Sequence, residues 1–163
     1  MTERAAHEVR VEAIDRIYCE LTWHGQKHAI QTLTRPEIDL TLPQMVTLLA
    51  IHDRGSCRMG TLAEATQQSG GTLTGIVDRL IEDGLVERVR SANDRRVIHV
   101  TLTADGQTRV RQVLDARRED IQRILASFDA HEIDQFERLL SRFLQGVRGA
   151  LPAVDGPPRE LEA

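Results

Sequence analysis

An arginine-rich segment lies near the middle of the chain. Residues 88–99 hold a single acid, Asp94, and four arginines: Arg88, Arg90, Arg95 and Arg96. Four positive charges less one negative charge give this segment +3, in a chain whose net charge is −4. Guanidinium groups bind phosphate through paired hydrogen bonds and are attracted into narrow minor grooves of DNA, where negative potential is concentrated. Charge placed in this way favours nucleic-acid binding; a solvated turn with weak surface ion pairs is the alternative.

The arginines fall around the turn of a predicted β-hairpin. Residues 85–90 form one predicted strand, and residues 97–103 form a second, in which apolar residues alternate with polar ones. This alternation is typical of a half-buried strand. The connecting residues 91–96 contain an Asn-Asp pair, which favours a turn. Asp94 lies two residues before Arg96 and could hold its guanidinium in place by a bidentate contact.

Two short predicted helices precede the hairpin. Residues 61–68 and 72–83 have helical patterns and are joined by a turn over residues 69–71. The expected outer face of the second helix carries Gly71, Thr74, Gly75 and Asp78, with Thr72 and Arg79 on its flanks. Side chains this small let a helix backbone approach base edges in the major groove, so the pair is a predicted helix-turn-helix. The alternative role for the glycines is close helix packing, with Thr72 only capping the helix, and both roles are compatible.

Four further helices are predicted on either side. They cover residues 8–33 and 43–53 before the pair, and 104–128 and 130–147 after the hairpin. The helices over residues 8–33, 104–128 and 130–147 carry apolar stripes. These stripes are too extensive for one small chain to cover, which favours a symmetric homodimer. We therefore divide the chain into residues 1–35 (N-terminal dimerisation helix), 36–106 (DNA-binding domain), 107–148 (C-terminal dimerisation helices) and 149–163 (flexible tail).

The composition restricts the class of protein. The chain is 40% hydrophobic and only 3% aromatic, so its core should be aliphatic. No apolar run is long enough for a bilayer, and the two cysteines are too few for a disulfide framework, so we expect a cytoplasmic protein without membrane contact. Glycine-rich phosphate loops and the HExxH and GxSxG motifs are missing from the sequence, which argues against an enzyme and indicates no cofactor.

Several motifs in series resemble the MarR (multiple-antibiotic-resistance regulator) family. They are Leu40-Thr-Leu-Pro-Gln44, Leu62-Ala-Glu64, Thr72-Leu-Thr-Gly-Ile-Val-Asp-Arg-Leu80, Asp83-Gly-Leu-Val-Glu-Arg88, Asp94-Arg-Arg96 and Val100-Thr-Leu-Thr-Ala-Asp-Gly106. The resemblance implies a mainly α fold with a small β-hairpin wing, that is, a winged helix-turn-helix flanked by N- and C-terminal dimerisation helices. It also implies a recognition helix from Thr72, and a wing in which Asp94 orients Arg96 toward the minor groove.

The functional prediction is a homodimeric, sequence-specific transcriptional regulator that binds an inverted-repeat operator in double-stranded DNA. The resemblance implies a repressor that a small-molecule effector releases from this operator. The predicted DNA-contacting residues are Ser69, Gly71, Thr72, Thr74, Gly75, Asp78, Arg79, Arg90, Asp94, Arg95 and Arg96. The resemblance implies that a ligand, often phenolic or otherwise anionic, binds between the dimerisation and winged-helix parts. A helical protein-binding adaptor is the alternative of another class, but it leaves the arginine turn unexplained.

The candidate sensor residues lie on the predicted helix over residues 8–33 and just after the predicted helix over residues 43–53. Trp23, with His24 and His28, is the predicted effector contact; the two histidines are four residues apart, a metal-chelating spacing, but no third ligand is evident and no metal site is predicted. Cys19 and Cys57 are candidates for a redox-sensing regulator of the same fold. The neighbours Arg54 and Arg58 could lower the pKa of Cys57.

Overall fold

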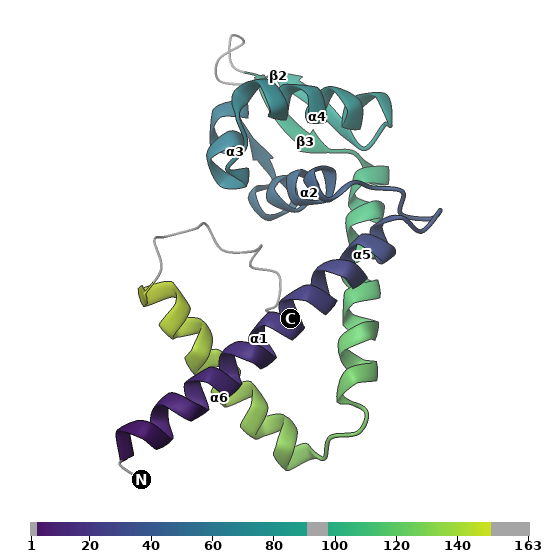
Figure 1. Cartoon of the computed structure of the whole chain (residues 1–163). Coiled ribbons are helices and arrows are strands. Elements are labelled where there is room, and N and C mark those ends of the chain that lie inside the picture. The colour runs from purple at the N-terminus through teal and green to yellow at the C-terminus, as the bar shows by residue number, and fades with distance from the viewer. Residues whose placement is uncertain (1–2, 91–97, 151–163) are drawn as a thin grey trace. The chain divides into compact units, whose positions relative to one another are not determined.

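The computed structural model describes residues 3–90 and 98–150, and the chain divides into two compact units. The first unit, Met1–Leu42, consists of α1 (Glu3–Leu33) and a turn. The predicted first helix is confirmed; it begins earlier than predicted and continues without a break through Gly25 (Figure 1). In the turn, the Asp39 amide donates to the Arg35 carbonyl (2.8 Å) and the Leu40 amide to the Leu33 carbonyl (2.9 Å).

The second unit begins at Pro43 and holds the remaining elements. These are α2 (Leu42–Arg54), β1 (Ser56–Cys57), α3 (Met59–Thr66), α4 (Gly70–Glu82), β2 (Val86–Arg90), β3 (Ile98–Leu102), α5 (Ala104–Leu125) and α6 (Ala130–Ala150). Throughout the described part of the chain, every helix is too short or too polar to cross a lipid bilayer. The predicted division into four segments stays a prediction.

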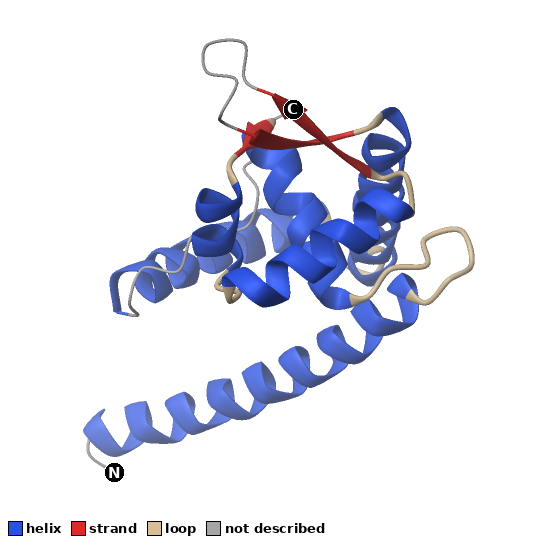
Figure 2. Ribbon diagram, turned by 90° about the horizontal axis from the view of Figure 1, so that it is seen from above, coloured by secondary structure: helices blue, strands red, loops and turns tan. Residues whose placement is uncertain are grey.

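The three strands form one antiparallel sheet in the order β1-β3-β2. Within the second unit, the sheet lies behind α4 in Figure 1 and at the top of Figure 2. The predicted hairpin is confirmed, with a register that pairs Val86 with Leu102 and Arg90 with Ile98. The strand β1 was not predicted, because two residues are too few to show an alternating pattern. The predicted turn over residues 91–96 lies outside the described residues.

The core of the second unit is aliphatic, as the composition predicts. Its fully buried side chains include Leu48, Ile51, Leu62, Leu73, Val77, Leu80, Val86, Val100 and Val110. They come from α2, α3, α4, both hairpin strands and α5, so the helix pair and the hairpin share one core. A helix pair followed directly by such a hairpin is a winged helix-turn-helix, and the predicted fold class is confirmed.

The base of the hairpin is joined closely to the start of α5. Thr103 is the predicted N-cap: its hydroxyl oxygen accepts from the Gly106 amide (3.0 Å), and its hydroxyl donates to the carbonyl of Gly84 (2.7 Å). The Thr103 amide donates to the Leu85 carbonyl (3.1 Å). A Cβ atom at Gly106 would lie 2.0 Å from that same carbonyl oxygen. Only glycine fits this junction without a shift of the backbone.

The last described helix of the second unit is α6, which begins with the predicted capping box. The Asp129 carboxylate accepts from the Glu132 amide, and the Glu132 carboxylate accepts from the Asp129 amide, both at 2.9 Å. The rings of Phe128 and Phe136 pack with their centroids 6.3 Å apart. The outer apolar face of α6 is half exposed and consists of Phe136, Leu139, Leu140, Phe143 and Leu144.

Candidate nucleic-acid interface

The helix α4 begins at Ser69, which acts as its N-cap. The Ser69 hydroxyl oxygen accepts from the Thr72 amide (3.2 Å) and lies 2.8 Å from the Thr72 hydroxyl. The predicted start at Thr72 is therefore wrong by one half-turn, because Gly70 and Gly71 belong to the helix. A side-chain cap satisfies one of the amides that a first helical turn leaves unpaired, which offsets the poor helix propensity of glycine.

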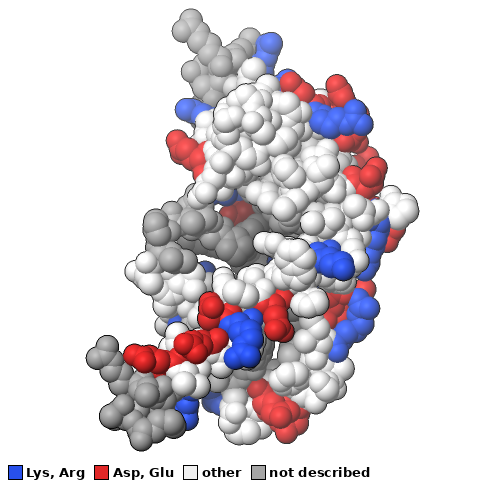
Figure 3. Space-filling view, viewed as in Figure 1, with Lys and Arg blue, Asp and Glu red and all other residues white. Residues whose placement is uncertain are grey.

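The two faces of α4 differ sharply in burial. Leu73, Val77 and Leu80 are 0% exposed and anchor the helix to the core. The opposite side is exposed and carries residues of the predicted DNA-contacting face: Gly71, Thr72, Thr74, Gly75 and Asp78. In the view of Figure 3, the surface over this helix is mostly uncharged. The helix face that is exposed to solvent therefore consists mainly of small, uncharged residues.

The threonine hydroxyls of this face are already engaged within the helix. The Thr74 hydroxyl donates to the Gly70 carbonyl (2.7 Å), and the Thr72 hydroxyl is paired with Ser69. Their oxygens can still accept a hydrogen bond, and their methyl groups can contact the methyl group of thymine. The face therefore offers base contacts without a long side chain.

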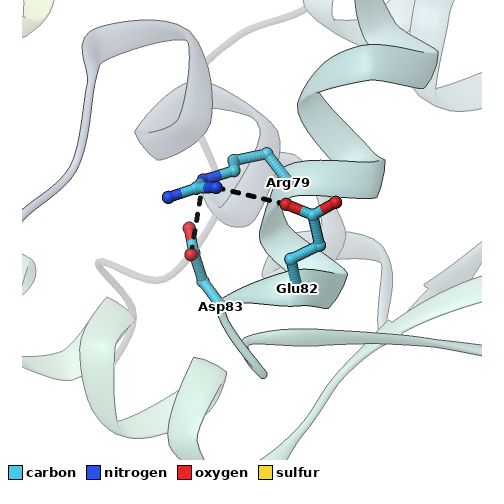
Figure 4. Close-up of polar contacts among 3 residues, drawn as sticks. All are labelled: Arg79, Glu82 and Asp83. Carbon is cyan, nitrogen blue, oxygen red and sulfur yellow. Dashed lines mark hydrogen bonds and ion pairs between the residues drawn. The ribbon is translucent and has the colours of Figure 1, made fainter.

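Arg79, predicted as a DNA contact, is held at the far end of α4 (Figure 4). Its Nη1 lies 3.2 Å from Oε2 of Glu82 and its Nε lies 3.4 Å from Oδ1 of Asp83. The guanidinium is thus neutralised by two carboxylates of the same helix end. To contact a phosphate, Arg79 would have to share or break these exposed ion pairs, which are weak.

Asp78, also predicted as a DNA contact, forms an ion pair with the hairpin. Its Oδ1 accepts from Nη2 of Arg88 at 2.6 Å, across ten residues of sequence. Arg90 lies two residues farther along β2, on the same face of the strand as Arg88, because side chains alternate along a strand. The structure therefore brings two of the predicted arginines to the side of the hairpin that faces α4. Asp94, Arg95 and Arg96 lie outside the described residues.

The sensor candidates lie elsewhere in the chain. Trp23 is 69% exposed on α1, and His24, His28 and Cys19 are exposed on the same helix. Among the residues that the structure describes, no three histidine, cysteine or acidic side chains are grouped so as to hold a metal ion. The predicted roles of these four residues in effector binding or oxidation stay predictions.

Cys57 does not have the environment that its arginine neighbours suggested. It lies in β1 and is buried, and this burial raises the pKa of the thiol, while Arg54 has a smaller lowering effect. The expected lowering of the pKa is therefore wrong in direction, because loss of solvation outweighs the nearby positive charge. A raised pKa leaves less thiolate, the form that reacts with oxidants.

Comparison with known proteins gives the family of the chain. A model of the MarR family matches residues 40–98. The uncharacterized HTH-type transcriptional regulator YsmB of Bacillus subtilis is 32% identical over 103 residues, which cover 63% of this chain and 70% of YsmB. A solved structure of a MarR family protein from Bacillus stearothermophilus is 31% identical, covers 90% of this chain and 98% of its own, and superposes with a TM-score of 0.69.

The chain belongs to the MarR family. This MarR family member is thus a transcriptional regulator rather than an enzyme, as predicted. Another solved MarR-like structure is BpsR of Bordetella bronchiseptica, 28% identical, which covers 79% of this chain and 98% of its own with a TM-score of 0.54. That structure concerns the regulation of BpsR DNA binding by 6-hydroxynicotinic acid.

Two features of the candidate interface were not predicted from the sequence. One is the capping role of Ser69, for which a serine directly before two glycines was the available signal. The other is the ion pair between Asp78 and Arg88, which has no local signal because its partners meet only after α4 packs on the hairpin. Both concern how α4 is held in place, rather than which side chains it exposes.

Proposed function

We propose that this regulator binds double-stranded DNA as a homodimer, with each α4 in a major groove and each wing along the adjacent minor groove. The observation that carries this proposal is the form of α4: an apolar face completely buried, an opposite face of small side chains, and an arginine-bearing hairpin directly after it. A helix enters the major groove only if its outer side chains are small or flexible enough.

The proposed dimer is supported by apolar surface that the single chain leaves exposed. On α6, Leu139 is 63% exposed and Phe143 is 48% exposed. On α1, Ile14, Ile17, Leu21 and Trp23 are also largely exposed. Monomers rarely present such continuous apolar faces, and a two-fold partner that covered them would set two copies of α4 one turn of DNA apart.

We further propose repression, relieved by a small effector. A dimer on two half-sites that overlap a promoter would exclude RNA polymerase from that DNA. Relief by an aromatic acid is supported by the effect of 6-hydroxynicotinic acid named for the BpsR structure. Trp23, His24 and His28 are the residues we propose for the effector contact; the aromatic ring would stack on the ligand, and a histidine would pair with its carboxylate.

The test begins with duplex DNA from upstream of the gene, titrated with protein at several salt concentrations. Arg96→Ala should weaken binding to all duplexes that contain the site and reduce the dependence of log K on log salt by about one phosphate contact, because its guanidinium is proposed to lie in the minor groove between the phosphates without reading a base. Thr74→Ala should instead change base preference, by about 1–3 kcal/mol at one position, with an unchanged salt slope. Arg118→Ala on α5 is the control, which should bind like the native protein.

Two results would contradict the proposal. A protein that stays monomeric and ignores these duplexes at low ionic strength has no such function. Equal effects of Arg96→Ala and Thr74→Ala on sequence preference and on salt dependence would remove the separate roles of wing and helix. Adding 6-hydroxynicotinic acid, peroxide or a divalent metal in separate arms of the same titration identifies the class of effector.

A further inference from the structure

The contact between α4 and β2 includes an ion pair on the exposed side of α4. The helix face that carries Asp78 is the face proposed to enter the major groove, yet the carboxylate is bound to Arg88 of the hairpin at 2.6 Å. Both side chains are about half exposed, at 49% and 44%. The pair therefore lies at the outer edge of the junction between helix and hairpin, rather than in the core.

The strand register shows what this pair holds. Val86 and Leu102 are paired across the hairpin and are both buried, so they define its inner face. Arg88, two residues farther along, lies on the same face and reaches Asp78. Arg90 follows on that face at the outer end of the described strand. The ion pair thus braces the hairpin against α4 between its buried base and its arginine-bearing end.

The charge of Asp78 argues against a direct contact with DNA. A carboxylate on this face is repelled by phosphates, and to accept a hydrogen bond from a cytosine amino group it would have to weaken its 2.6 Å bond to Arg88. Together, the Asp78 carboxylate and the Arg88 guanidinium have a net charge of zero. Asp78 also keeps Arg88 from binding phosphate, a contact without sequence information.

We propose that Asp78 is a positioning residue that acts through Arg88. The pair fixes the angle between α4 and the hairpin, so that helix and wing reach their grooves together, and it withholds one arginine from non-specific phosphate binding. Asp78 thereby raises the ratio of specific to non-specific affinity without reading a base. This inference rests on the proposed DNA-binding function and replaces the predicted direct contact of Asp78.

The experiment compares three variants on two duplexes. The probes are a duplex selected from a randomised pool by the native protein and a shuffled version of its sequence. Asp78→Ala removes the brace. Glu82→Ala is the matched control, because it removes one acid from the same helix while Arg79 keeps Asp83. The double variant Asp78→Arg/Arg88→Asp exchanges the two side chains. It restores an ion pair of one aspartate and one arginine and leaves the net charge unchanged.

The expected result has three parts. Asp78→Ala binds the shuffled duplex more tightly, with a salt slope steeper by about one phosphate contact, because Arg88 is released. Its ratio of specific to non-specific affinity falls by about two- to fivefold, the range that an exposed ion pair supports. The double variant recovers the native ratio and salt slope, and Glu82→Ala keeps both.

Other results overturn the inference. If Asp78→Ala loses affinity only for the selected duplex, with an unchanged salt slope, and the double variant fails to recover it, Asp78 reads a base. If the affinity ratio of Asp78→Ala is native, the pair is an ordinary surface contact. Thermal unfolding of each variant checks that the fold is retained. A native protein that selects no duplex would defeat the proposed function itself, which distinguishes the two failures.

Discussion

At the scale of single residues, the surroundings of a side chain decide its chemistry more than its neighbours in sequence do. Cys19 and Cys57 are both free thiols, but one is exposed on a helix and the other is buried in a strand. Arg54 attracts a thiolate at position 57, yet burial raises the pKa of that thiol. A peroxide would therefore meet a poor nucleophile at Cys57.

Alkylation should separate the two thiols. At about pH 8, we expect iodoacetamide to modify Cys19 readily and Cys57 at least about tenfold more slowly, because burial both limits access and disfavours the thiolate. Mass spectrometry of the peptides after timed quenching measures the two rates. Unfolding in urea should make the rates similar, and equal rates in the folded protein would contradict the assigned environment.

The same pKa shift has a consequence for stability. The folded protein holds the Cys57 proton more tightly than the unfolded chain, so the contribution of this group is complete below the ordinary thiol pKa and decreases as the pH rises above it. Cys57→Ser should show a smaller decrease in the free energy of unfolding between about pH 8 and pH 10 than the native protein. Urea unfolding at both pH values checks this difference.

At the scale of elements, the sequence predicts the helices and strands whose apolar residues recur at regular spacing. It misses features that depend on residues far away in the sequence or on a cap. The helices around the core and the hairpin follow from apolar spacing. The sequence predicts a start of α4 at Thr72, which is two residues too late, because Gly70 and Gly71 favour a turn. The Ser69 cap brings both glycines into the helix. The two residues of β1 form a strand only because β3 lies beside them, with Cys57 paired to Val100.

The candidate site divides in the same way. The exposed face of α4 follows from helical periodicity, so Gly71, Thr74 and Gly75 could be placed from the sequence. The partners of the charged residues could not, since they depend on how α4 lies on the hairpin. Arg79 is bound within its own helix, whereas Asp78 is bound to Arg88.

The junction between the hairpin and α5 gives a prediction about elements. Gly106→Ala would set a Cβ atom 2.0 Å from the Leu85 carbonyl oxygen, so the start of α5 must shift. We expect a loss of about 1–3 kcal/mol in the free energy of unfolding, as for other overpacked sites. Urea denaturation followed by circular dichroism measures this loss.

Gly60→Ala is the matched control for that variant. Gly60 lies in the first turn of α3, as Gly106 lies in the first turn of α5, but a Cβ atom there meets nothing within 4 Å. Since alanine favours helices, this change should be neutral or stabilising by up to about 1 kcal/mol. Equal stability of the two variants would show that the junction is loose.

At the scale of the whole molecule, the exposed apolar face of α6 predicts a partner. Leu140 lies at its centre, so Leu140→Glu would place an unpaired charge in the proposed dimer interface. We expect the dimer dissociation constant to rise by at least about 100-fold and operator affinity to fall with it, because single copies hold one α4 only. Sedimentation equilibrium and DNA titration measure both.

Gln145→Glu introduces the same side chain on the opposite side of α6. This control variant should keep the native mass and DNA affinity. If Leu140→Glu also remains a dimer, the interface lies elsewhere. Circular dichroism establishes that the helices persist in each variant, so that loss of association is not mistaken for unfolding.

The carbonyl oxygen of Leu85 accepts a hydrogen bond from the Thr103 amide. It also lies where a side chain at Gly106 would begin. The Thr103 hydroxyl is also hydrogen-bonded to the Gly84 carbonyl, so the base of the hairpin is held to the start of α5 by several close contacts. We therefore expect the first turn of α5 and the base of the hairpin to move together. We expect any force that rotates α5 to be transmitted to the hairpin, rather than absorbed where the two are joined.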